Sequence, residues 1–146
     1  MRVSISDKLY GPLLHLYVGE PWKTVIKDVL KVYPGAEKED ILKEEGDVSC
    51  AGITHAWDGP AGLILGIRMA YLNLACPQCL GTLTHEVAHA TFHVLGRADI
   101  ITDVARDPKQ EAFCYLSSYY LTSFLEQLKK RKYKGKCPHK KYLTNT

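Results

Sequence analysis

The chain has 146 residues, of which 46% are hydrophobic and 24% are charged. These ordinary values exclude an intrinsically disordered protein. The net charge of +3 comes mostly from a basic run at residues 129–132, which is typical of a solvated helix end and gives no reason to expect nucleic acid as a partner. No apolar window reaches the roughly 18 residues of a membrane span, and the N-terminus lacks the features of a secretory signal. We therefore expect one domain over residues 1–134 that acts in the cytoplasm without a membrane partner.

The N-terminal half of the chain predicts strands around one helix. Alternating apolar residues indicate a short strand at residues 2–6, and a stronger signal, bounded by glycine and proline, indicates a strand at 13–18. Apolar residues at helical spacing then predict a helix from 22 to 33. A hairpin signal follows, in which strands at 50–57 and 63–69 flank a turn that contains glycine and proline.

The C-terminal half predicts two long helices. The first begins at Cys76-Pro77, where proline suits the first helical position, and ends near Gly96; the second spans about residues 107–132. Residues 97–106 are expected to cross between these helices, and 135–146 to form a mobile tail. The expected fold class is α+β, with a small mixed or antiparallel sheet of three to five strands packed on helices.

The first of these helices contains the sequence Thr84-His85-Glu86-Val87-Ala88-His89, which has the pattern H-E-x-x-H. Residues four apart lie on one face of a helix, so His85 and His89 can turn imidazole nitrogens toward one metal ion. Glu86 is close enough to hold a metal-bound water without being a ligand. This arrangement is typical of zinc peptidases, in which the glutamate is the general base. The alternative is a pair of histidines that cap or pack a helix.

A catalytic zinc ion needs a third protein ligand, and the candidates are His93, Asp99, Asp103 and Glu111. His93 lies eight residues after His85, about 12 Å along the helix axis, whereas ligand atoms lie about 2 Å from the metal. We therefore expect His93 to pack or to support the ligands. Glu111 lies in the first turn of the next helix, where a carboxylate is electrostatically favoured, and an antiparallel helix would present it to the histidines. Glu111 is the favoured third ligand.

Two motifs together resemble a known group of enzymes. The sequence His85-Glu86-Val87-Ala88-His89, with His93 after it and Gln110-Glu111-Ala112-Phe113-Cys114-Tyr115 downstream, looks like the zincin metallopeptidases whose third ligand is a glutamate on the next helix. It is similar to small phage-encoded H-E-x-x-H proteins with a downstream E-A-x-x-Y, and more distantly to the gluzincin-like ImmA/IrrE-type metallopeptidases. The resemblance covers about residues 50–125.

The resemblance implies roles for individual residues. His85, His89 and Glu111 would be the ligands of a Zn²⁺ cofactor, and Glu86 would be the general base. The resemblance also implies a mixed sheet whose edge strand, within residues 50–69, lies beside the active-site helix. The substrate would be a protein or peptide, and a phage-encoded protein would act in the host cytoplasm.

Peptide hydrolysis also needs a donor that stabilises the tetrahedral oxyanion. Tyr119 and His55 are the favoured catalytic candidates for this role, with Tyr115 and His93 behind them, although a tyrosine on an apolar helix face commonly belongs to the core. The predicted function is a zinc-dependent metallopeptidase that acts on a particular protein. The alternative is a non-catalytic zinc-containing binding or assembly protein, which a site plugged by the C-terminal tail would favour.

The chain has five cysteines, and this odd number without a secretory signal argues against a disulfide framework. Cys76-Pro77-Gln78-Cys79 has C-x-x-C spacing, and Cys137-Pro138-His139 could add a third thiol and an imidazole to form a structural zinc site. A single C-x-x-C is common, however, and the segment Cys137-Pro138-His139 has neither the C-x-x-C nor the H-x-x-x-H spacing of a zinc finger. Buried, inert thiols are the preferred interpretation.

Overall fold

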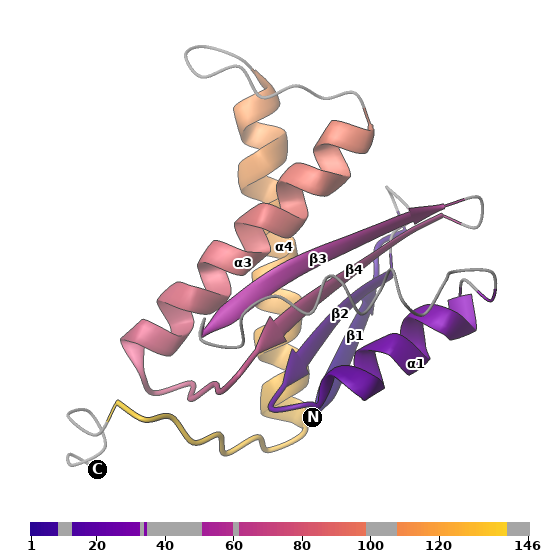
Figure 1. Cartoon of the computed structure of the whole chain (residues 1–146). Coiled ribbons are helices and arrows are strands. Elements are labelled where there is room, and N and C mark those ends of the chain that lie inside the picture. Colours follow the sequence, from indigo (N-terminus) through magenta and orange to yellow (C-terminus); the bar gives the residue numbers. More distant parts are fainter. Residues whose placement is uncertain (9–12, 33, 35–50, 60–61, 99–107, 140–146) are drawn as a thin grey trace.

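The computed structural model describes residues 1–8, 13–32, 34, 51–59, 62–98 and 108–139 (Figure 1). Within these ranges the elements are, in chain order, β1 (Arg2–Ser6), β2 (Leu13–Val18), α1 (Trp22–Val32), β3 (Gly52–Gly59), β4 (Gly62–Met69), α3 (Pro77–Arg97) and α4 (Pro108–Lys130). The α+β class is confirmed, and each expected strand and helix is found within a few residues of its predicted bounds. Most of the crossing segment expected at 97–106 lies outside the described residues.

The four strands form one mixed sheet in the order β1-β2-β4-β3. β1 is antiparallel to β2, β2 is parallel to β4, and β3 and β4 form an antiparallel hairpin. β3 is therefore an edge strand, and α3 packs against it. The expectation of a mixed sheet with an edge strand beside the helix of the H-E-x-x-H motif is confirmed as far as strand order and helix packing are concerned.

Helices cover both faces of the sheet: α3 and α4 lie on one face and α1 lies on the other (Figure 1). The core beneath α3 and α4 contains Leu16 and Leu65, whereas Tyr17 packs with the residues of α1. β4 is accordingly an almost continuous apolar run, as expected for a strand buried on both faces. Gly66 is required within it because a Cβ there would lie 2.8 Å from the Trp57 ring.

The chain changes direction after α4 through a left-handed turn at Lys132, which has φ 50°. The Tyr133 amide donates to the Leu128 carbonyl at 3.0 Å, and the Lys132 amide donates to the Lys129 carbonyl at 2.9 Å. These two bonds form the Schellman motif that ends many helices. The turn sends residues 133–139 back toward the start of α3 (Figure 1).

The segment after this turn packs against the loop that precedes α3. The Tyr133 hydroxyl donates to the Leu72 carbonyl at 3.1 Å, and a Cβ at Gly135 would collide with the same carbonyl oxygen. Of the tail expected to be mobile from residue 135, residues 135–139 follow this contact, and 140–146 lie outside the described residues. In the part of the chain that is described, no helix has the length and apolar character of a membrane span.

Candidate functional site

The two motif histidines meet on the exposed face of α3. His85 and His89 are one helical turn apart, their Nε2 atoms are 3.0 Å apart, and their rings are nearly perpendicular. Two imidazole nitrogens on a tetrahedral zinc ion lie about 3.3 Å apart, given Zn–N bonds of about 2.0–2.1 Å. The two nitrogens are hydrogen-bonded to each other here, and they are close enough to share one metal ion bound from the solvent side of the helix.

Glu86 lies between α3 and the edge strand β3, and its side chain is only 6% exposed. The Thr54 hydroxyl of β3 lies 2.7 Å from Oε2 of Glu86 and 2.9 Å from its backbone carbonyl oxygen. Gly52, two residues earlier, allows this close approach, since a Cβ there would lie 2.9 Å from Cγ of Glu86. The carboxylate is thus fixed to the sheet, while the histidines face outward.

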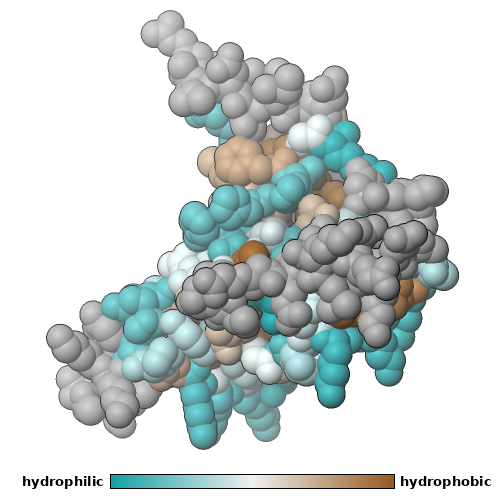
Figure 2. Space-filling model, viewed as in Figure 1, coloured by the Kyte–Doolittle hydropathy of each residue, from teal (hydrophilic) through white to brown (hydrophobic). Residues whose placement is uncertain are grey.

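A groove of about 420 Å³ continues from His89 along the C-terminal half of α3. Its walls come from the β3–β4 hairpin and from α3, and its lining residues are Ala56, Leu63, His89, Phe92, His93, Gly96 and Arg97. The exposed ring of Phe92 packs on Phe113 of α4 with centroids 4.6 Å apart. Figure 2 shows a hydrophobic area where the upper parts of α3 and α4 meet. His93 is an exposed lining residue of the groove and not a packed one.

The structure does not bring Glu111 to the two histidines. Ser117 of α4 donates to the Thr91 hydroxyl at 3.1 Å, which fixes the level at which the two helices meet. Glu111 lies six residues before Ser117, about 9 Å along the axis, and therefore level with the C-terminal end of α3. Among the described residues, no group of three metal-ligand side chains includes His85, His89 and Glu111. The role of Glu111 as third ligand therefore stays a prediction, and the described structure does not show the expected convergence.

His55 was expected at the site, and the structure places it on the opposite face of the sheet. Adjacent strand residues point to opposite faces, and Thr54 faces α3. His55 is buried among the aromatic rings of Trp22 and Trp57, at centroid distances of 4.8 and 5.6 Å. Burial, together with the charge of Arg68, lowers the pKa of His55 to about 4. This histidine is a core residue on the sheet face away from α3, so the structure does not bring it to His85 and His89.

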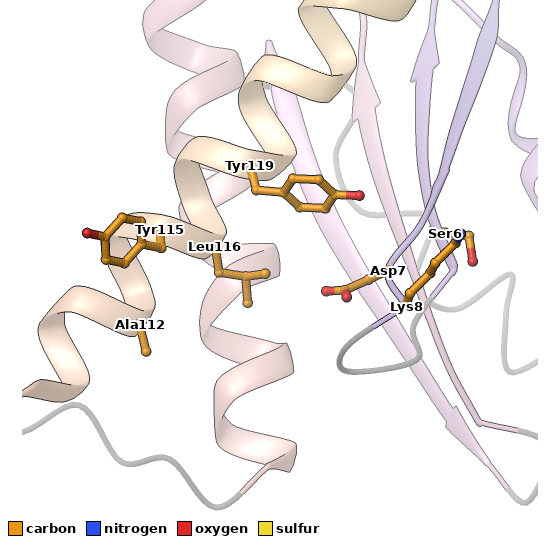
Figure 3. Close-up of a pocket in the computed structure, with 7 residues that line it drawn as sticks. All are labelled: Ser6, Asp7, Lys8, Ala112, Tyr115, Leu116 and Tyr119. Carbon is orange, nitrogen blue, oxygen red and sulfur yellow. The ribbon is translucent and has the colours of Figure 1, made fainter.

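Tyr119 belongs to a different cavity. It is 46% exposed and lines a space of about 520 Å³ between α4 and the end of β1, with Ser6, Asp7, Lys8, Ala112, Tyr115 and Leu116. Figure 3 shows its ring extending from α4 toward the segment that carries Asp7. Neither Tyr119 nor Tyr115 lines the groove beside His89. The structure therefore does not support either tyrosine as the oxyanion donor.

A second group of potential metal ligands lies at the N-terminal end of α3. The ligand atoms of Cys76, Cys79, Cys137 and His139 all lie within 4.8 Å of one another, so this group could hold a metal ion. Cys76 and Cys79 are buried, and Cys137 and His139 are half-buried. Burial raises the pKa of Cys76, but hydrogen bonds from neighbouring groups outweigh this effect and lower the pKa to about 7. The thiols expected to be inert thus form, with His139, a group that could hold a metal ion.

The comparisons with known proteins give no relative of this chain. No family model matches it, and no match is found among the curated proteins or the solved structures. The function must therefore be inferred from the chemistry of the residues described above.

Proposed function

We propose that this chain is a zinc-dependent metallopeptidase in which His85 and His89 bind the metal ion and Glu86 is the general base. The observation that carries the proposal is the 3.0 Å separation of the two Nε2 atoms on an exposed helix face. Helical spacing alone allows two histidines to share a face, but it does not require their nitrogens to point at one position. Glu86, which follows His85 directly in the sequence, gives the set the composition of a hydrolytic zinc site.

The chain's own residues would supply the proton transfer. A bound zinc ion lowers the pKa of its water toward 7 and polarises a substrate carbonyl. The Thr54 hydroxyl holds Oε2 of Glu86 in place, which leaves Oε1 to accept the proton of the attacking water. Glu86 would then deliver that proton to the leaving amine. Fixing the base by a hydrogen bond from the sheet reduces the reorganisation needed at the moment of reaction.

The surroundings of the site favour an extended peptide as substrate. β3 is one of the two edge strands among the described strands, and a peptide can pair with such a strand through main-chain hydrogen bonds. The adjoining groove offers an apolar wall at Phe92 and a cation at Arg97. A peptide that follows the groove would pass His89, so its carbonyl groups would come close to the proposed metal position.

The alternative, a binding or assembly protein without activity, predicts a site closed by the chain itself. The candidate residues for such a plug, Cys137 and His139, lie instead beside Cys76. Cys76 is nine residues before His85, which is about 13 Å along α3. The motif histidines are exposed and adjoin a groove, an arrangement that favours catalysis over closure.

Three carboxylates that follow α3 in the chain are the proposed sources of the third ligand. They are Asp99 and Asp103, which lie outside the described residues, and Glu111, which would have to approach from the end of α3. Single alanine variants at these positions, titrated with zinc in a background that lacks Cys137, would assign the ligand. Removing the true ligand should weaken zinc binding by at least tenfold, whereas equal affinities in all three variants would mean that another residue completes the site.

The substitution Glu86→Gln tests the proposed function. It should retain zinc because Glu86 is not a ligand, retain the fold because the side chain is nearly isosteric, and lower turnover by about 10²–10⁴-fold because an amide cannot take the proton. Glu126→Gln, the same change at an exposed position of α4, is the matched control and should keep full activity. Cleavage of a mixed peptide library, detected by labelling newly formed amino termini, is the assay. Equal cleavage by wild type and Glu86→Gln would refute the peptidase proposal.

A further inference from the structure

We propose that Cys76, Cys79, Cys137 and His139 bind a structural zinc ion that fastens the C-terminal segment to the start of α3. Three thiols and one imidazole are a standard ligand set for structural zinc. The Sγ atom of Cys76 is 3.6 Å from Nδ1 of His139. A tetrahedral zinc ion with a Zn–S bond of about 2.3 Å and a Zn–N bond of about 2.0–2.1 Å separates S and N by about 3.6 Å.

Local structure explains the position of the first two thiols. Cys76 is the N-cap residue of α3, Pro77 occupies the first helical position, and Cys79 lies in the first turn. The Cys76 amide donates to the Asn73 carbonyl at 3.0 Å, which fixes the turn before the helix. Both sulfur atoms are therefore held side by side at the N-terminal end of α3.

The other two ligands reach this point because the chain folds back after α4. The left-handed turn at Lys132 directs the chain toward the start of α3, and the contacts of Tyr133 and Gly135 with Leu72 hold it against the loop before α3. The His139 ring then packs edge-on against Tyr71, with centroids 5.5 Å apart. These contacts fix the position and the orientation of the imidazole, as neighbouring groups do around metal-bound histidines.

The composition of the group points to zinc and to a structural role. A redox-active C-x-x-C pair needs only its two thiols, whereas here a third thiol and an imidazole converge on the same point from a distant part of the chain. Thiolate-rich tetrahedral sites select zinc over magnesium, calcium or manganese. All four positions are filled by protein atoms, so no position remains for a water or a substrate, as is characteristic of structural sites.

The second site is tested independently of the peptidase proposal in a variant that lacks both motif histidines, His85→Ala with His89→Ala. Purified under reducing conditions, this variant should still contain about one zinc ion per chain. Adding Cys137→Ser or His139→Ala should reduce the zinc content to less than a tenth. Cys114→Ser is the matched control, because Cys114 is an exposed thiol of α4 outside the group, and it should leave the zinc content unchanged.

Cobalt substitution gives a readout that does not depend on a destabilised variant. Cobalt bound to the full chain with intact Cys and His residues should show sulfur-to-metal charge-transfer absorption and the intense visible bands of tetrahedral coordination. These bands should persist without His85 and His89 and disappear in Cys137→Ser. A metal-free chain lacking the motif histidines, or a Cys76–Cys79 disulfide in the freshly purified protein, would overturn the proposal. Loss of activity in Glu86→Gln would not bear on the proposed structural zinc site.

Discussion

Gly52 controls how closely α3 approaches the edge strand, and Gly52→Ala tests this packing. The residue has no left-handed φ, so alanine fits its backbone and the effect is steric. The added Cβ would lie 2.9 Å from Cγ of Glu86, 2.9 Å from Cγ2 of Thr82 and 3.1 Å from Sδ of Met69. Carbon atoms prefer separations of about 3.5–4.0 Å, so α3 or its side chains must shift by about half an ångström. Overpacking of this kind costs about 1–3 kcal/mol.

The reduced entropy of the unfolded alanine variant offsets about 0.4–1 kcal/mol of this cost. The expected net loss is therefore about 1–2 kcal/mol, or roughly 3–6 °C in the melting temperature for a chain of this size. Gly81→Ala is the control on α3, because a Cβ there meets no atom within 4 Å. It should stabilise the helix by up to about 1 kcal/mol.

Urea unfolding of the two variants and of Gly52→Ala combined with Thr82→Ser measures these changes. Replacing Thr82 by serine removes one of the colliding methyl groups and should recover part of the lost stability. If Gly52→Ala were as stable as the wild type and Glu86 still supported full turnover, the close packing of β3 on α3 would be refuted.

Three further predictions concern other contacts of the fold. Thr54→Val removes the donor to a buried carboxylate and should cost about 1–3 kcal/mol of unfolding free energy, whereas Thr54→Ser should be nearly neutral in the same urea titration. Lys132→Gly relieves a left-handed backbone and should raise stability by about 0.5–1 kcal/mol, while Lys134→Gly should bring no gain. His15 and His55 have pKa values lowered to about 4, chiefly by burial, so the unfolded chain binds more protons than the folded chain between pH 6.5 and 4. The contribution of each neutral histidine to the free energy of unfolding should be fully present above about pH 6.5 and should fall by about 1–2 kcal/mol at pH 5. Thermal melts recorded from pH 7.5 to 4.5 measure this dependence, and His15→Gln and His55→Gln should each flatten it.

Local signals predicted the elements well because those elements depend on short-range patterns. The proline at the start of each long helix and the apolar repeat within it placed α3 and α4 to within two or three residues. The spacing of His85 and His89 was likewise decisive, since helix geometry alone determines whether two such nitrogens share a face.

Long-range features were not predictable in the same way. Alternation along β3 separates Thr54 from His55, but it does not say which of the two faces α3 covers, so the sequence could not place His55 on the side away from the motif. The position of Glu111 depends on the level at which two helices pack, which apolar contacts and the Thr91–Ser117 hydrogen bond determine. The grouping of the thiols depends on a left-handed turn at a lysine, for which the sequence carries no glycine signal.

Both candidate metal centres lie on α3, and this arrangement has a physical consequence for the motif. The group that includes Cys76 would anchor the N-terminal end of the helix to the C-terminal segment, while the contacts of Gly52 and Thr54 with Glu86 hold its middle to the sheet. Two separate anchors on one rigid helix leave little freedom for rotation about its axis. With that end anchored, the backbone positions of His85 and His89 would be fixed before a metal ion binds between them, which would reduce the ordering cost of binding.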